Sequence, residues 1–378
     1  MRTSSIGASM HVTTLQSCVF EVHKSRLGLR TFRAMTRSCS AQASVDQRCF
    51  RVGIVSDVQY ADIKDGHSFL GVPRYYRASL EGLRRAVSGW QAQKVDFGIQ
   101  FGDLIDGFNP KDQSEIAMKS VLDEFALLQK PVYHMIGNHC LYNLSRQRLN
   151  EVLGIQGVSS YYSFSPHKAW RFVVLDGYDV SMLGWPEGHP LHTEAKAILD
   201  ERNVNENKNN PEGHEGPARR FVQFGGGIGA EQLDWLKAQL AESKAANQRV
   251  IVCGHLPLHP DTCIGTCLLW NYEQVLQAIW DAGNVVATFT GHAHNDGYKV
   301  DKHGVHHRVL SAVLETEPGK DCYGWLDAYS DHLDLVGVGD LDSQHMPFGT
   351  AANGASCQQE HADNTTQAED ATLERQPR

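Results

Sequence analysis

Five short apolar segments of the chain end in the same way, with a turn that carries Asp, Asn, Gln or His. The segments are read as buried strands, because each is a short run of β-branched and other apolar residues. Ligands of α/β sheets bind beyond the carboxyl ends of the strands, so five strands would deliver polar side chains to one edge. In four of the five turns a glycine stands beside the polar residue. The turns are Ser56-Asp57-Val58-Gln59, Gly102-Asp103, Gly137-Asn138-His139, Gly254-His255 and Gly291-His292-Ala293-His294.

The rest of the pattern alternates strands with helices and then changes to strands alone. Strands are expected at 50–56, 95–101, 132–136, 170–175, 249–253 and 285–290. Apolar residues at helical spacing predict helices at 73–91, from the second strand to about 129, from 229 and at 273–282. Beyond 295 only strand patterns follow, at 297–300, 305–310 and 332–338. This order predicts an α/β domain of βαβ type that ends in antiparallel strands.

The two ends of the chain differ in composition from its middle. Residues 1–45 are rich in Arg and Ser, and Glu21 is the single acidic residue among them. This composition is typical of a transit peptide or of a disordered extension. We expect one domain over 46–345, with a polar insertion at about 184–220, and a disordered tail over 346–378. The predicted location is the cytoplasm, or a chloroplast or mitochondrion if the extension is a transit peptide.

Composition excludes several classes of function. The formal net charge of −9 argues against a broadly basic surface for nucleic acids. No apolar run approaches the roughly 18 residues of a membrane span. The nine cysteines include no CxxC pair, so neither a zinc ribbon nor a disulfide scaffold is indicated. We expect a monomer that acts on a small molecule.

The residue types at the strand ends indicate a metal site. They offer oxygen and imidazole donors without thiolates, which suits Mn²⁺, Mg²⁺, Fe²⁺ or Zn²⁺. A single turn of this kind is more often ordinary turn chemistry than a ligand. An ordered set of five, each at a strand end, is hard to explain in that way.

The order of these five blocks over residues 51–338 resembles the calcineurin-like metallophosphoesterase superfamily. The resemblance implies a four-layer α/β/β/α sandwich around a two-metal site. It implies that His139 contacts the substrate phosphate and protonates the leaving oxygen. It further implies that Asp103 bridges the two cations. One cation would be held by Asp57, Gln59, Asp103 and His294, and the other by Asp103, Asn138, His255 and His292.

Three residues depart from patterns within the superfamily. Gln59 stands where most members have histidine, and its neutral oxygen favours Mn²⁺ or Mg²⁺ over Zn²⁺. Asp106 stands where purple acid phosphatases have a metal-binding tyrosine, so an iron–tyrosinate site is not expected. Asp106 either orients His139 or caps the following turn. Cys140 replaces an acid that helps to orient this histidine in many members, which leaves the tuning of His139 open.

Longer stretches around the blocks resemble the manganese-dependent ADP-ribose/CDP-alcohol diphosphatases. The stretches are 57–62, 102–109, 137–143, 254–260 and 291–298. This resemblance implies hydrolysis of the pyrophosphate of ADP-ribose, CDP-choline, CDP-ethanolamine or CDP-glycerol. The products would be AMP or CMP and a phosphorylated partner, after attack by a hydroxide that bridges two cations. Mn²⁺ is the expected metal, and Mg²⁺ is an alternative.

Contacts with the substrate are harder to derive from the sequence. Aromatic rings at Tyr60 and Phe69 either stack on a nucleobase or pack under their loop. The full set of candidate contacts is Tyr60, Phe69, Asn109, Tyr142, Asn143 and Cys267. Two alternatives remain open: a cyclic-nucleotide phosphodiesterase or phosphomonoesterase of the same fold, and a non-catalytic interaction module. A module of that kind is expected to have lost ligands, whereas every ligand position here is filled.

Overall fold

Two six-stranded sheets form the centre of the protein. The computed structural model describes residues 47–156 and 159–349. The first sheet has the order β14 (Gln344–Pro347), β13 (His332–Gly339), β12 (Cys322–Ala328), β1 (Phe50–Val55), β4 (Phe97–Gln100) and β5 (Val132–His134). The second has the order β10 (Gly297–Val300), β11 (His306–Val309), β9 (Val285–Thr290), β8 (Arg249–Cys253), β7 (Trp170–Val174) and β6 (Tyr162–His167). A small hairpin pairs β2 (Gly66–His67) with β3 (Pro73–Arg74).

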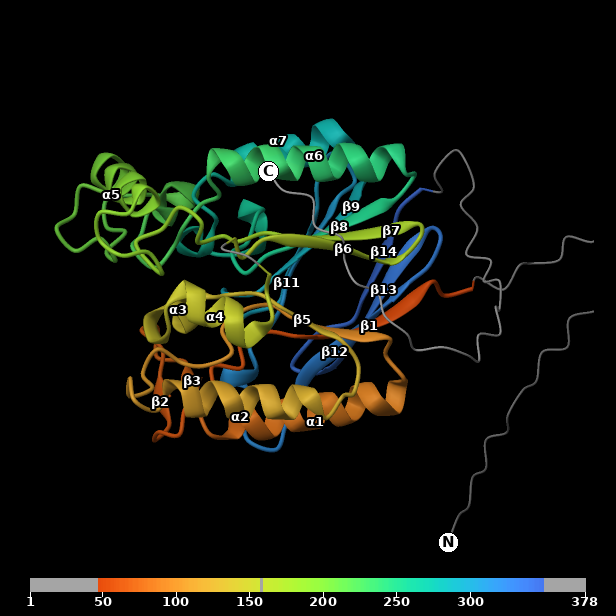
Figure 1. The fold of residues 1–378 in the computed structure, drawn as a ribbon, viewed down its shortest axis with the longest axis horizontal. Coiled ribbons are helices and arrows are strands. Elements are labelled where there is room, and N and C mark those ends of the chain that lie inside the picture. Colours follow the sequence, from red (N-terminus) through yellow and green to blue (C-terminus); the bar gives the residue numbers. More distant parts are fainter. Residues whose placement is uncertain (1–46, 157–158, 350–378) are drawn as a thin grey trace, which may run out of the picture. The chain divides into compact units, whose positions relative to one another are not determined.

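Helices cover the outer faces of both sheets (Figure 1). The α-helices are α1 (Ala78–Gln93), α2 (Ser114–Ala126), α3 (Asn138–Asn143), α4 (Arg146–Leu153), α5 (Pro190–Arg202), α6 (Ala230–Ala245) and α7 (Tyr272–Ala282). Short 3-10 helices are η1 (Gly216–Arg220), η2 (Pro260–Thr262), η3 (Gly265–Cys267) and η4 (Val313–Glu315). The pair α1 and α2 lies against the first sheet, and the pair α6 and α7 against the second (Figure 1). The predicted four-layer α/β/β/α sandwich is confirmed.

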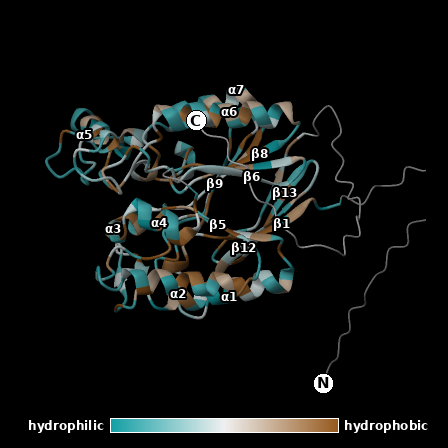
Figure 2. Cartoon of the chain, in the orientation of Figure 1, coloured by the Kyte–Doolittle hydropathy of each residue, from teal (hydrophilic) through white to brown (hydrophobic). Residues whose placement is uncertain are grey.

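Aromatic side chains fill the space between the two sheets. The ring of Phe50 in β1 meets Trp170 in β7 edge-on, with centroids 5.6 Å apart. Phe97 in β4 meets Phe172 in the same way at 5.8 Å. Burying each such ring contributes about 1.5–3 kcal/mol, so this layer is a major source of stability. Figure 2 shows the hydrophobic residues gathered inside the layers and the hydrophilic ones on the outer helix faces.

The parallel strands of the two sheets place the predicted site residues together, at the carboxyl ends of these strands. β1, β4 and β5 are parallel to one another, and β7, β8 and β9 are also parallel. The sequence did not predict β12, although it pairs with β1 in the middle of the first sheet. Six of its seven residues are buried, so it shows no alternation of polar and apolar residues.

Several element boundaries differ from the predictions, and α2 begins only at Ser114 although a helix was expected from the end of the second strand. The predicted helix at 73–91 begins only at Ala78, because Pro73 belongs to β3. The predicted tail begins at 346, yet Met346 lies in β14 and is fully buried. The predicted exposed insertion at 184–220 contains α5, whose Leu199 is buried. The predicted extension over 1–45 lies outside the described residues, as does the tail from 350 on. Within the described ranges, no helix is long and apolar enough to cross a membrane.

Candidate active site

The strand ends that carry the predicted ligands have an unusual backbone. In the described part of the chain, eight residues other than glycine have a positive φ, and three of them stand at the ends of α1, α2 and α6. The surrounding structure must hold such a backbone against a cost of about 1–3 kcal/mol for each residue, and such residues cluster at functional sites. The other five are all predicted cation ligands: Asp57, Gln59, Asp103, His292 and His294.

Glycines at the strand ends make room for the ligands. Gly102 has a φ of 101°, and a β-carbon there would collide with the imidazole of His255. A β-carbon on Gly137 would collide with the carboxylate of Asp103. Glycine is therefore required at both places by the close approach of a ligand from another strand.

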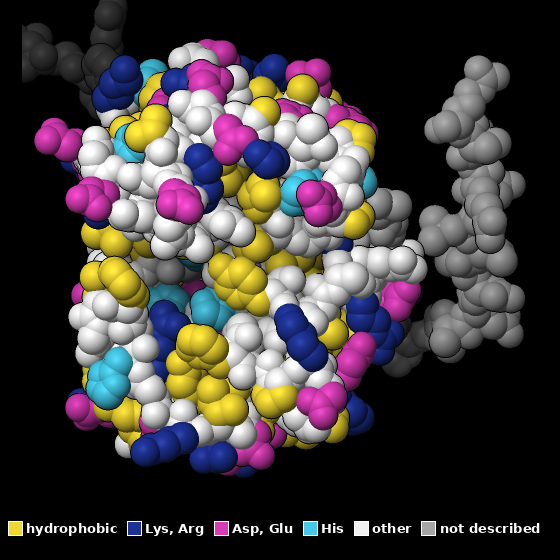
Figure 3. All heavy atoms as spheres, turned by 90° about the vertical axis from the view of Figure 1, so that its left-hand side faces the viewer, with side chains coloured by type: hydrophobic (Ala, Val, Ile, Leu, Met, Phe, Trp, Pro, Cys, Tyr) yellow, Lys and Arg dark blue, Asp and Glu magenta, His cyan; other side chains and the backbone are white. Residues whose placement is uncertain are grey.

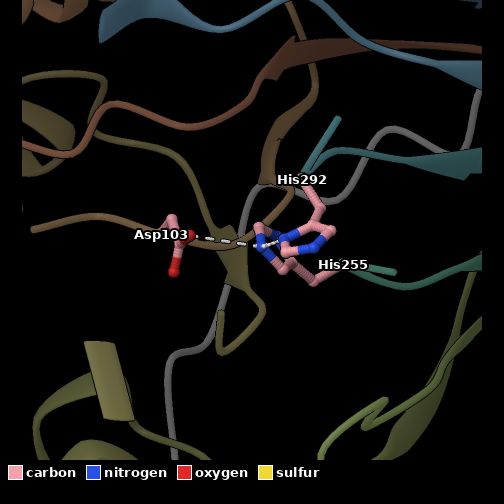
Figure 4. A group of neighbouring side chains, drawn as sticks. All are labelled: Asp103, His255 and His292. Carbon is pink, nitrogen blue, oxygen red and sulfur yellow. Dashed lines mark hydrogen bonds and ion pairs between the residues drawn. The ribbon is translucent and has the colours of Figure 1, made fainter. Parts of the chain in front are cut away.

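One set of side chains gathers around the end of β8. His255 Nε2 lies 3.3 Å from Asp103 Oδ2 and 3.2 Å from His292 Nδ1 (Figure 4). Ligand atoms of these three residues all lie within 4.8 Å of one another. Asn138, at the start of α3, is buried, and its Oδ1 accepts a hydrogen bond from the Tyr178 hydroxyl at 3.1 Å. Three of the four residues predicted for the second cation are thus in one cluster.

A second set gathers around the turn after β1. His294 Nε2 lies 3.3 Å from Asp57 Oδ1 and 2.8 Å from Gln59 Nε2. Gln59 Nε2 is also 3.4 Å from Asp103 Oδ2. Asp103 therefore lies between the two sets, as expected for a carboxylate that bridges two cations.

Hydrogen bonds on the far side of two histidine rings orient them. His294 Nδ1 lies 2.8 Å from Glu315 Oε1, and His255 Nδ1 lies 2.7 Å from the carbonyl oxygen of Phe101. Each Nδ1 faces an acceptor, so it carries the proton and donates. The Nε2 of each ring is then the atom aimed at the centre, where a cation would take the place of any proton on it. Outward donation from Nδ1 is the arrangement that metal-binding histidines require.

The electrostatics of the site favour positive charge. Burial alone would raise the pKa of Asp57, but His255 and the hydrogen bond from His294 hold this pKa below its usual value. Burial opposes a charge on His294, yet Asp57 and Glu315 raise the pKa of this histidine to about 10. His292 differs, because burial and the charge of His255 lower its pKa to about 3. Ionised carboxylates thus attract a positive charge to the centre while His292 keeps a free lone pair.

The residues present fit two divalent cations. Gln59 Oε1 and His292 Nε2 are buried without a hydrogen-bond partner, and a half-turn of the Gln59 amide would bring Oε1 to the place of Nε2 beside His294 and Asp103. Leaving such an atom unpaired costs about 1–3 kcal/mol, and a cation would supply the missing partner. The donors are carboxylate, amide and imidazole groups without thiolates, a set that suits Mn²⁺.

His139 and Asp106 form a pair beside the ligands. His139 Nδ1 lies 3.1 Å from Asp106 Oδ2, and the Gly107 amide lies 3.0 Å from the same nitrogen. The Gly107 amide donates its hydrogen to Nδ1, so in this arrangement Nδ1 is an acceptor and the proton of the ring is on Nε2. Asp106 Oδ1 accepts from the Phe108 amide at 2.8 Å, so the carboxylate both caps the turn and faces the histidine.

Cys140 has a structural position behind this pair. The residue is fully buried, and its Sγ accepts a hydrogen bond from the Leu104 amide at 3.3 Å. Burial and the charge of Asp103 raise the pKa of the thiol to about 12, so it stays neutral. The negative charge beside His139 therefore comes from Asp106.

Two of the six predicted substrate contacts form hydrogen bonds to the backbone of neighbouring loops instead. Asn109 is buried, and its Nδ2 donates to the carbonyl oxygens of Tyr60 and Asp106. The Nδ2 of Asn143 donates to the carbonyl oxygens of Asp106 and His139. Both amides hold the loops together, because their donors are used by the backbone. This differs from the prediction that they contact the substrate.

The other four candidates have different surroundings. Tyr142 meets the His139 ring edge-on, with centroids 5.6 Å apart. Phe69 is fully exposed between β2 and β3, whereas Tyr60 is half-buried and Cys267 is buried. On the face of the molecule toward the left of Figure 1, histidine side chains lie in a hollow with hydrophobic side chains around it (Figure 3). A ligand in this hollow would meet both polar and aromatic groups.

Three residues of the site were not predicted. Glu315 contacts His294, Tyr178 contacts Asn138, and the ring of Phe224 lies 5.9 Å from that of His292. Tyr178 follows Asp176-Gly177 after β7, which is the same pattern as at the other strand ends and was therefore detectable. Glu315 and Phe224 follow no such pattern, and only the folded chain brings them to the site.

Comparison with known proteins identifies relatives over most of the chain. The family model "Calcineurin-like phosphoesterase" matches residues 50–296. A protein of Oryza sativa subsp. japonica is 50% identical over 309 residues, covering 81% of this chain and 96% of that protein. An Arabidopsis thaliana protein is 51% identical over 300 residues, covering 79% and 96%. Both carry the name manganese-dependent ADP-ribose/CDP-alcohol diphosphatase.

A solved structure agrees with the fold and with the number of metal ions. The crystal structure of a dimetal phosphatase from Danio rerio superposes with a TM-score of 0.77 and 36% sequence identity. It matches 80% of this chain and all of that chain. The similarity therefore extends over both sheets rather than over the motif residues alone.

Proposed function

The chain belongs to the calcineurin-like phosphoesterase family, and from this premise we propose that it hydrolyses the pyrophosphate bond of ADP-ribose and of CDP-alcohols with manganese. The observation that carries the proposal is the pair of ligand sets that share Asp103 beside the His139–Asp106 pair. The relatives named above support the substrate class and the metal, since they are half identical over nearly their whole length. The products would be AMP or CMP and a phosphorylated partner.

The ligand sets determine where the cations would bind. Asp57, Gln59 and His294 would hold one cation, the Asn138, His255 and His292 side chains the other, and Asp103 both. Two bound cations would neutralise the phosphoryl oxygens and lower the pKa of the attacking water. The hydrogen bonds of Glu315 and of the Phe101 carbonyl keep two of the imidazole rings in the orientation that binding needs.

His139 is the chain's own proton donor in this proposal. Nδ1 lies beside Asp106 and accepts from the Gly107 amide, so Nε2 is the nitrogen that would carry the proton toward a substrate. A proton on Nε2 would pass to the phosphate oxygen that leaves when the pyrophosphate bond breaks. The adjacent Tyr142 ring restricts the imidazole from one side, so the donor stays in place.

Exposed aromatic rings support a nucleotide as the substrate. Phe69, between β2 and β3, and Phe108, on the loop after β4, are large and exposed. A nucleobase that stacked on such a ring would bury apolar surface of both. Phe108 packs against Tyr76 with ring centroids 6.4 Å apart, which holds that loop in position.

The proposal is tested with chelator-treated protein and four substrates. ADP-ribose, CDP-choline, a cyclic nucleotide and p-nitrophenyl phosphate are each incubated with Mn²⁺, Mg²⁺ or Zn²⁺. We expect AMP and CMP to appear with Mn²⁺, and the His255→Ala variant to be inactive. His303→Ala is the matched control, since His303 is an exposed histidine in a turn of the second sheet.

Other outcomes would select the alternatives. Cleavage of the ester or of the cyclic nucleotide, with both diphosphates intact, would reject the substrate class and keep the metal centre. Absence of hydrolysis with all three metals would favour a non-catalytic interaction module.

We also propose a monomer that acts on small molecules and does not bind nucleic acid. The formal net charge of −9 supports the absence of nucleic-acid binding, because phosphate backbones need basic surfaces. Light scattering of the purified protein gives its mass in solution, and a dimer mass would reject the monomer. The proposed location is the cytoplasm, with an organelle as the alternative, and the mature N-terminus of the cellular protein decides between them.

A further inference from the structure

A second group of histidine and aspartate side chains lies on the hairpin of β13 and β14. His332 and Asp334 are two residues apart on β13, so they point to the same face of the strand. His345 on β14 is paired directly with Asp334 in the strand register. Leu333 and Met346 point to the opposite face and are fully buried. The three polar side chains thus share the outer face of this hairpin.

Their ligand atoms converge on a single point. His345 Nδ1 lies 2.6 Å from Asp334 Oδ1, and His332 Nε2 lies 3.4 Å from Asp334 Oδ2. One ligand atom from each residue lies within 4.8 Å of both others. The histidine rings are 5.1 Å apart between centroids, close enough for both to bind one ion.

Two contacts on the side of His332 away from Asp334 fix the orientation of its ring. Its Nδ1 lies 2.6 Å from Asp331 Oδ1, and its ring stacks on Tyr329 with centroids 4.3 Å apart. Donation from Nδ1 to a carboxylate leaves the Nε2 lone pair directed at the other two side chains. Metal-binding histidines are held in this way, because the outer hydrogen bond sets the tautomer and the ring direction.

The group is separate from the candidate active site. Leu333, next to His332, pairs with Ala328 of β12, which pairs in turn with Phe50 at the start of β1. The ligand Asp57 follows the other end of β1. Strands rise about 3.3 Å per residue, so the two groups stand about 20 Å apart along the sheet. An ion at the hairpin would therefore not share ligands with the active site.

We propose that His332, Asp334 and His345 bind a transition-metal ion of the zinc type on the outer face of the hairpin. Two imidazoles and one carboxylate with a fourth position for water are a common ligand set for Zn²⁺. Hard ions such as Mg²⁺ prefer oxygen donors, so the hairpin selects against them.

Such an ion would connect the edge strand of the first sheet, β14, to its neighbour β13. β14 is four residues long, lies at the edge and pairs only with β13 among the described strands. Two ligands come from β13 and one from β14, so a bound ion connects the two strands through side chains. The connection stabilises the edge strand, which is otherwise the first to separate from a sheet.

The test counts zinc ions in the full chain by equilibrium dialysis and elemental analysis. We expect the wild type to hold one more Zn²⁺ per chain than His345→Ala. His303→Ala, which removes an exposed histidine elsewhere, should match the wild type. Because the result is a difference between variants, it does not depend on how many ions the active site holds. Equal counts in the wild type and in His345→Ala would overturn the proposal.

A second variant and a melting measurement guard against misfolding. Asp334→Asn keeps the size of the side chain and removes its charge, and it should also lose one Zn²⁺ per chain. Zinc should raise the melting temperature of the wild type and of His303→Ala by more than that of Asp334→Asn. If zinc shifts all three equally, the three side chains only form hydrogen bonds with one another and the site is rejected.

Discussion

The protein carries two groups of histidine and aspartate that use the same residue types in opposite ways. At the strand ends, five ligands have a left-handed backbone, and the aspartates are fully buried. At the hairpin, His332, Asp334 and His345 lie on regular strands, and His345 is exposed. Both groups bring imidazole nitrogen and carboxylate oxygen within hydrogen-bonding distance.

The difference shows what each group requires from the fold. The strained turns and the buried charges of the strand-end group cost free energy, and the rest of the structure must offset this cost to keep the ligands in place. The hairpin group is positioned by the strand register alone, so it lowers the free energy of unfolding little. A reacting centre justifies the first kind of construction, whereas a bound structural ion is compatible with the second.

The largest effect is expected at the shared carboxylate. Asp103→Asn removes one negative charge from both ligand sets and should lower kcat/KM by about 10³-fold, the equivalent of about 4 kcal/mol. Asparagine adopts a left-handed backbone readily, so the chelator-treated variant should melt no lower than the wild type. Kinetics with Mn²⁺ and thermal melting of both proteins check the two parts. Full activity of Asp103→Asn would break the comparison, because the strained turn would then have no role in catalysis.

A smaller loss is expected at the proton donor. His139→Gln removes the acid without removing a predicted ligand, and it should lower kcat by about 10²-fold. The number of bound Mn²⁺ ions should be unchanged. Asp106→Asn should have a weaker effect of the same kind, since it acts through the orientation of His139. Loss of Mn²⁺ in His139→Gln would instead mean that His139 is itself a ligand.

A still smaller effect is expected from a residue that orients a ligand. Glu315→Gln replaces the acceptor for His294 Nδ1 by a neutral amide and should weaken Mn²⁺ binding by about 10–100-fold. Binding isotherms of the chelator-treated protein measure this directly. At saturating Mn²⁺ the variant should recover most of its kcat, which a general folding defect would not allow. Glu317→Gln is the matched control, because Glu317 is exposed two residues further along.

The smallest effect is expected at the hairpin in the absence of metal. Asp334→Asn should change the free energy of unfolding by less than about 1 kcal/mol in chelator, because it weakens only an exposed ion pair on a regular strand. Denaturant unfolding of this variant and of the wild type in chelator measures the change. A large destabilisation by Asp334→Asn would show that the hairpin depends on more than an exposed ion pair.

The sequence alone predicted most of the metal centre because its residues follow a rule of position. Each ligand comes directly after a buried strand, so the sequence alone places Asp57, Asp103 and His255 at one edge. The structure adds that the turns are left-handed, which also explains how two histidines only two residues apart, His292 and His294, both point inward.

The site residues that the sequence did not predict are brought to the site by contacts between distant segments. Glu315 reaches His294 through the packing of η4, and no local pattern marks it. Asn109 and Asn143 are candidate substrate contacts by sequence, but their donors are used by backbone carbonyls that only the folded loops bring near. The hairpin group needed the register of β14, a strand that the sequence pattern did not indicate.

Anomalous scattering from a crystal of the chain grown with Mn²⁺ shows directly where the cations bind. We expect two strong peaks, one near Asp57, Gln59 and His294 and one near Asn138, His255 and His292, with Asp103 between them. A single peak, or manganese bound away from the strand ends, would contradict this arrangement.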